Sequence, residues 1–200
     1  MPSGNLPVLH LPANGYRRLR WRNGAGWTRE ILAAAPVEGG DWDWRLSIAE
    51  IEADGPYSLF PGVEREQVLL SGEGLALDFG AGDERALAPP HGRQRFAGDL
   101  PVAARRVSGR AEVFNLMWRP ARVSARLWFR PLVGSMLLFV DPGSTWAVHM
   151  VAGRARLGAE MLLERGDSAL LGGGPGMRGR QLLEGAGELI LVRVDAGQPA

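Results

Sequence analysis

Short apolar or alternating runs, separated by Gly, Pro and Asp, recur along the whole chain. They occupy residues 67–70, 74–79, 113–117, 136–140, 146–150, 168–171 and 188–194. Strands of this length bounded by turn residues are typical of an all-β sandwich or barrel. No long segment has the periodicity of an amphipathic helix, although residues 122–129 are ambiguous. We therefore predict an all-β protein.

The two halves of the chain follow one plan. Residues 66–79 form a strand, a Gly72–Gly74 turn and a second strand, and residues 146–163 repeat this order through Gly153. A chain of 200 residues that is 46% hydrophobic can bury the cores of two small, tightly joined units. The repeat predicts two stacked double-stranded β-helix units, which are jelly rolls.

Composition argues against several classes of function. The net charge is +1 with acidic and basic residues interspersed, which gives no case for nucleic acid as a partner. The absence of cysteine removes disulfides, thiolate nucleophiles and thiolate metal ligands. We see neither a secretory signal nor an apolar stretch near the ~20 residues of a membrane span. We expect a cytoplasmic protein that does not bind membranes.

Residues 21–30, WRNGAGWTRE, gather two indoles, two arginines, an amide, a hydroxyl and a carboxylate around two glycines. Packing alone does not explain such a density of hydrogen-bonding groups. Strand alternation places Thr28 with Glu30, and Arg45 with Ser47, on shared faces. A barrel face built from such residues and roofed by aromatic rings has the make-up of a small-molecule pocket. Alternation leaves open whether this face points inward or forms a surface patch.

The motif W-x-N-G-x-G-x-T-x-E within this stretch resembles the HutD/Ves family. The resemblance continues through WRLSIA at 44–49, DGPYSLFPG at 54–62, GEG at 72–74, FAGDLP at 96–101 and FNLM at 114–117. It implies a bicupin of the RmlC-like cupin superfamily. Residues 1–119 would form the barrel that carries the motifs, residues 120–200 a degenerate second barrel, and residues 120–133 the crossover between them.

Metal-binding cupins carry G-x5-H-x-H-x3,4-E-x6-G in their first motif. Anchored on Gly72, this pattern places its two histidines at Ser58 and Phe60 and its glutamate at Arg65. None of these side chains is a first-choice ligand for a divalent ion. We therefore expect no metal and no cofactor.

An arginine at the glutamate position inverts the charge of the pocket. The planar paired donors of a guanidinium suit a carboxylate, so Arg65 and Arg45 are candidates for anion capture. The alternative is that each pairs with an internal carboxylate such as Glu30 or Glu50. The predicted ligand-binding residues are Trp21, Asn23, Thr28, Glu30, Arg45, Ser47, Ser58, Phe60, Arg65 and Asn115.

The resemblance implies a non-catalytic protein that modulates histidine utilisation by binding a small anionic metabolite. The expected ligands are urocanate or a formylated or formiminylated glutamate. One alternative is a metal-free cupin isomerase or hydrolase in which Glu30 is the base and Arg65 and Asn115 stabilise charge. Another is an interaction module that binds a protein through its tryptophans. The second barrel is expected to serve as a lid, a dock or a homodimer surface.

Overall fold

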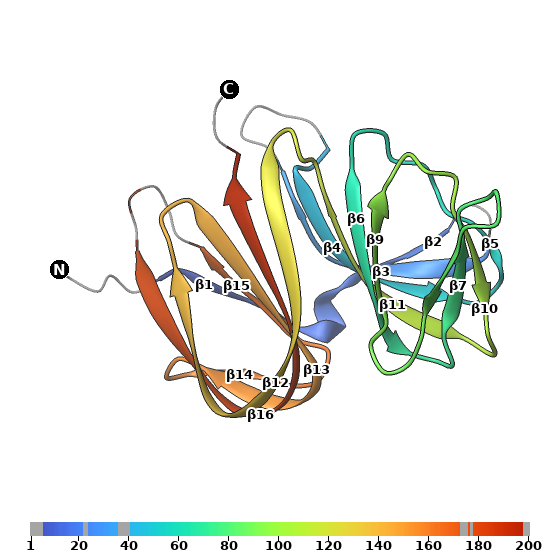
Figure 1. Ribbon diagram of the computed structural model, residues 1–200. Coiled ribbons are helices and arrows are strands. Elements are labelled where there is room, and N and C mark those ends of the chain that lie inside the picture. Colours follow the sequence, from blue (N-terminus) through green and yellow to red (C-terminus); the bar gives the residue numbers. More distant parts are fainter. Residues whose placement is uncertain (1–5, 22–23, 36–40, 173–175, 177, 198–200) are drawn as a thin grey trace. The chain divides into compact units, whose positions relative to one another are not determined.

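The computed structural model describes residues 6–21, 24–35, 41–172, 176 and 178–197 (Figure 1). Nearly all of its regular structure is β-strand, and the one helical element among the described residues is the 3-10 turn η1 (Ala13–Gly15). The prediction of an all-β, cupin-type chain with two units is confirmed. No described helix is long and apolar enough to cross a membrane.

The chain divides into two compact units. Residues 17–122 form the first, which we call the first barrel. Residues 6–16 and 123–197 form the second, which we call the second barrel.

The first barrel is built from two antiparallel sheets. In spatial order, the six-stranded sheet contains β2 (Arg17–Arg20), β3 (Gly26–Ala34), β4 (Trp44–Ile51), β11 (Ala111–Trp118), β6 (Glu64–Ser71) and β9 (Arg93–Ala97). The four-stranded sheet contains β5 (Gly55–Pro56), β10 (Ala103–Arg106), β7 (Leu75–Asp78) and β8 (Glu84–Leu87). Every pair of neighbouring strands is antiparallel, as in a jelly roll.

The interior of the first barrel changes character along its strands. Ala49, Ile51 and Val113 join an apolar cluster with residues of the four-stranded sheet. Two residues further along the same face, Ser47 and Asn115 are polar and buried. Because side chains alternate along a strand, these residues share the inward side of β4 and β11. One half of this interior is therefore a packed core, and the other half is available for a site.

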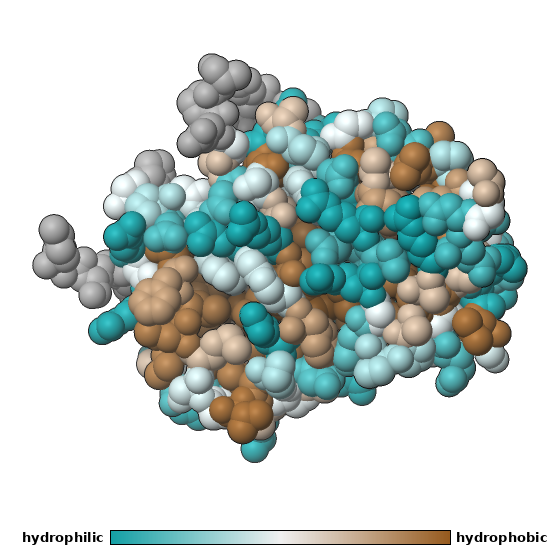
Figure 2. All heavy atoms as spheres, in the orientation of Figure 1, coloured by the Kyte–Doolittle hydropathy of each residue, from teal (hydrophilic) through white to brown (hydrophobic). Residues whose placement is uncertain are grey.

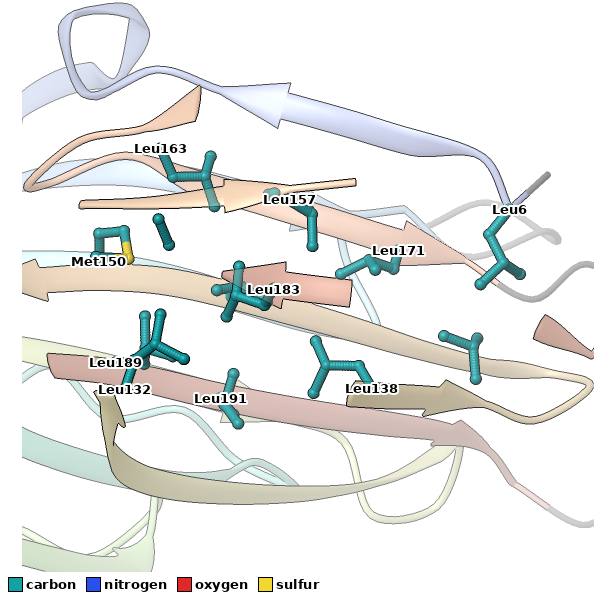
Figure 3. Packing of buried hydrophobic residues seen from close by; sticks show 14 residues of the cluster. Leu6, Leu132, Leu138, Met150, Leu157, Leu163, Leu171, Leu183, Leu189 and Leu191 are labelled. Atoms are coloured by element: carbon teal, nitrogen blue, oxygen red, sulfur yellow. The ribbon is translucent and has the colours of Figure 1, made fainter. Parts of the chain in front are cut away.

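The second barrel is one antiparallel sheet of β1 (Val8–Leu11), β15 (Ser168–Gly172), β13 (Ser144–Leu157), β16 (Gly179–Ala196) and β12 (Val123–Val140). A short strand, β14 (Met161–Leu163), pairs with β13. Figure 3 shows aliphatic side chains from several of these strands converging on a common core, among them Leu138, Leu157, Leu183 and Leu189.

The N-terminal segment belongs to the second barrel, whereas the sequence placed all of residues 1–119 in the first. Val8 to Leu11 pair with Leu171 to Ser168. The Tyr16 hydroxyl donates to the carbonyl of Gly166 at 2.8 Å, and the backbone N–H of Ala13 donates to Asp167 Oδ1 at 2.8 Å. These contacts between distant parts of the chain leave no local signal in the sequence.

Two further expectations for the second half were wrong. The predicted crossover at 120–133 is mostly strand, because β12 begins at Val123 and pairs with β16 along its whole length. The turn predicted at Gly153 is also absent, since β13 runs on to Leu157. A Cβ at Gly153 would clash with the carbonyl oxygen of Ala186 on β16, so this glycine permits close strand packing.

Candidate functional site

A cavity of about 430 Å³ lies in the polar half of the first barrel. Strands β2, β3, β4, β6 and β11 contribute to it, together with the segment around residues 56–60. Its lining residues are Arg20, Trp21, Thr28, Arg45, Ser47, Ala49, Pro56, Tyr57, Ser58, Phe60, Arg65, Gln67, Asn115 and Met117.

Strand register assembles the floor of the cavity in two rows. Ser47, Asn115 and Gln67 are partners across β4, β11 and β6. One step along the same face, Met117 lies between its partners Arg45 and Arg65. Directly opposed residues on antiparallel strands have Cβ atoms roughly 5 Å apart. Residues from three separate segments of the sequence therefore form one continuous surface that is polar except at Met117.

Arg65 is the most unusual side chain in the cavity. It is only 6% exposed, and no described carboxylate lies within ion-pair distance of it. Instead its guanidinium carbon lies 4.8 Å from the ring centre of Tyr57, 5.2 Å from that of Phe96 and 5.8 Å from that of Phe60. Burial, with a smaller contribution from Arg45, lowers the pKa of Arg65 to about 10. The cavity thus holds a desolvated cation that aromatic rings contact and that no acid of the described part of the chain neutralises.

Two buried amides beside Arg65 also have unused hydrogen-bonding groups. The Tyr57 hydroxyl donates to Gln67 Oε1 at 3.4 Å. Gln67 Nε2, Asn115 Oδ1 and Arg65 Nε are buried and have no partner among the described residues. Leaving a buried donor or acceptor unsatisfied costs about 1–3 kcal/mol. Two donors and one acceptor beside a cavity are therefore groups that a bound molecule can satisfy.

Arg45 differs from Arg65 because it has an internal acid. Its Nε lies 2.8 Å from Glu30 Oε2, and Glu30 also accepts from Arg17 at 3.3 Å. The internal-pairing alternative therefore describes Arg45, while Arg65 has no such partner among the described residues. Glu30 does not line the cavity and contacts it through Arg45.

Aromatic groups form another wall of the cavity. Trp21 Nε1 donates to Thr28 Oγ1 at 2.8 Å, which fixes the indole against β3. The Trp21 ring meets Tyr57 edge-on, with centroids 6.3 Å apart and an interplanar angle of 86°. Together with Phe60, these rings provide the apolar surface that small-molecule sites usually have.

The structure brings most of the predicted residues to one place. Those that line the cavity are Trp21, Thr28, Arg45, Ser47, Ser58, Phe60, Arg65 and Asn115. Glu30 lies just behind them, and Asn23 lies outside the described residues. The lining residues that the sequence did not predict are Arg20, Ala49, Pro56, Tyr57, Gln67 and Met117. Gln67 could have been found, because it lies two residues from Arg65 on the same strand.

The positions of the cupin metal motif lie at or beside the cavity but hold other chemistry. Ser58, Phe60 and Arg65 all line it. Within the described part of the chain, no three His, Cys, Asp or Glu side chains converge as metal ligands would. These donors do not suit a divalent cation, whereas Arg65 suits an anion.

Comparison with known proteins shows which family this chain resembles. The HutD family model matches residues 13–191. A protein of Pseudomonas putida, described as an uncharacterized 21.2 kDa protein in the hutC 3' region, is 38% identical over 120 residues, which are 60% of this chain and 63% of that protein. Protein Ves of Cronobacter sakazakii is 41% identical over 108 residues, 54% of this chain and 58% of that protein. Both matches span less than two thirds of the relative.

A solved structure covers more of the chain. HutD from Pseudomonas fluorescens SBW25, solved in a formate condition, superposes with a TM-score of 0.84 at 28% identity. The alignment covers 96% of this chain and all of that one. The family model spans most of the chain and the superposition extends through both barrels, so the chain belongs to the HutD family.

Proposed function

We propose that this chain is a non-catalytic binding protein that takes a small anionic metabolite into the cavity of the first barrel. The observation that carries the proposal is Arg65, a buried cation without a described carboxylate partner. An anion at its paired N–H groups would supply the missing charge in a water-poor setting, where charge-assisted hydrogen bonds are strong.

Urocanate or a formylated or formiminylated glutamate is the ligand class that we propose. Each joins a carboxylate to a further nitrogen group, so Arg65 would bind the carboxylate while Gln67 and Asn115 meet the other polar atoms. The cavity volume lies within the range of roughly 300–1,000 Å³ typical of small-molecule sites. Membership of the HutD family supports a role in modulating histidine utilisation through such an intermediate.

The alternative of a metal-free isomerase or hydrolase needs a base that reaches the substrate. Glu30, the base considered for that role, pairs with Arg45 and Arg17 and does not line the cavity. A general base must lie within hydrogen-bond reach of the proton that it abstracts. The geometry therefore favours binding over a reaction that depends on Glu30.

Titration calorimetry tests the proposal, with urocanate and N-formylglutamate as ligands and histidine, which has no net negative charge, as the comparison. We expect the anions to bind and Arg65→Met to abolish binding, while Arg105→Met, which removes an exposed arginine from the same barrel, leaves it intact. If neither anion binds, or if Arg65→Met binds both as the wild type does, the proposal is wrong. A bound anion recovered as a different compound would instead support an enzyme.

A further inference from the structure

An apolar patch covers part of the outer surface of the second barrel. It consists of Leu137 and Phe139 on β12 and Leu182 on β16, which are 41%, 62% and 40% exposed. Leu137 and Leu182 are register partners, so the patch is continuous across the two strands. Figure 2 shows hydrophobic surface on the second barrel. Exposed apolar groups that gather in this way mark interaction sites more often than singly scattered ones.

Charges of opposite sign flank the patch. Arg180 and Glu184 lie two residues before and after Leu182 on β16, and all three side chains are exposed. Neither Arg180 nor Glu184 forms an ion pair within the described residues. Arg156, the register partner of Glu184 on β13, lies beyond ion-pair distance. The strand therefore presents cation, leucine and anion at equal spacing.

This order is complementary to itself. Consider two copies packed face to face about a two-fold axis that runs across the strands along the Leu137–Leu182 row. This axis makes β16 of one copy antiparallel to β16 of the other. Leu182 then faces Leu182 of the other copy, and Arg180 of each copy faces Glu184 of the other. An isologous contact repeats every interaction, so one arginine and one glutamate per chain give two ion pairs. An apolar centre with a charged rim is the usual anatomy of such an interface.

We propose that this face of the second barrel is a homodimer interface whose partner is a second copy of the same chain. The backbone N–H of Gly158 bonds to the Leu182 carbonyl, which holds this part of β16 against the turn after β13 and leaves the exposed Leu182 side chain free to dock. Stable interfaces bury about 800 Å² per partner, so the patch forms the centre and the flanking polar residues the rim.

Light scattering coupled to size exclusion tests the interface on the full chain at micromolar concentrations. The wild type is expected to be a dimer. Arg180→Glu makes both facing positions of β16 acidic, and Glu184→Arg makes both basic, so each variant alone should dissociate with a Kd higher on the order of 10- to 100-fold. Mixed in equal amounts, the two variants should form a heterodimer, because each supplies the charge that the other lacks.

Arg105→Glu is the matched control, since it reverses one exposed arginine of the first barrel and should leave the dimer unchanged. Leu182→Ser disrupts the apolar centre without touching a charge, and thermal melting checks that each variant is folded. A monomeric wild type at these concentrations overturns the proposal. A dimer that survives both single reversals and Leu182→Ser also overturns it.

Discussion

Two arginines that line the cavity of the first barrel have opposite surroundings. Arg45 pairs with Glu30 at 2.8 Å, whereas Arg65 contacts three aromatic rings and has no described carboxylate partner. The sequence identified both residues as candidates but left internal pairing open for each. Only the register between strands shows that Glu30 lies near Arg45, because that contact joins β3 to β4.

Arg65→Met is expected to keep or raise the stability of the ligand-free protein. Burial lowers the pKa of Arg65 to about 10, so the folded state disfavours its charged form. This corresponds to a cost on the order of 3 kcal/mol at neutral pH, which an apolar side chain of similar length avoids. Thermal melting measures the effect. A variant that melts far below the wild type would show that the guanidinium holds the fold together.

Anion binding should be constant between about pH 7 and pH 9 and fall above about pH 10, where Arg65 loses its proton. Since the pKa of Arg65 is depressed in the folded state, the burial cost is fully present below about pH 10 and is relieved as the pH rises from there towards the ordinary pKa of an arginine. Ligand affinity and intrinsic stability should therefore change in opposite directions. Calorimetric titrations across this range test the point, and affinity that falls already near pH 7 would assign capture to a different group.

The sequence predicts side-chain alternation along a strand but not the pairing between strands. Alternation predicts that Arg45 and Ser47 share one face of β4, and both do line the cavity, because the period of a strand is a local property. Pairing is not local, so the register of Ser47 with Asn115 and of β1 with β15 could not be predicted. The prediction of a turn at Gly153 was wrong for a related reason, because this glycine accommodates a neighbouring strand.

Gly153→Ala should destabilise the second barrel by more than the ~1 kcal/mol that a positive φ alone costs a non-glycine residue. Its φ is +77°, and the added Cβ would clash with the Ala186 carbonyl. Gly143→Ala is the matched control, because Gly143 has a φ of +74° and nothing within 4 Å of its would-be Cβ. Urea unfolding compares the two variants. Equal losses would mean that strand proximity does not require this glycine.

At the scale of the whole molecule, the two barrels differ in what their interiors contain. The first has a cavity lined by polar and aromatic groups, whereas the second holds a large aliphatic core (Figure 3). This contrast supports the proposal that ligand binding belongs to the first barrel and association to the second.

Leu189→Ala in the second-barrel core should cost about 2–5 kcal/mol of stability, as large-to-small changes at fully buried sites do. The folded variant should still bind the anion with the affinity of the wild type. Chemical denaturation and calorimetry below the unfolding transition measure the two effects. A marked loss of affinity in the folded variant would show that the second barrel shapes the ligand site.

The most direct test of the account is a crystal structure of the chain with N-formylglutamate or urocanate bound. The account predicts the ligand carboxylate at the Arg65 guanidinium inside the first barrel, with Gln67 Nε2 and Asn115 Oδ1 bonded to the remaining polar atoms. A ligand in the second barrel beside Trp146 or His149, or one held in the first barrel without contact to Arg65, would contradict it.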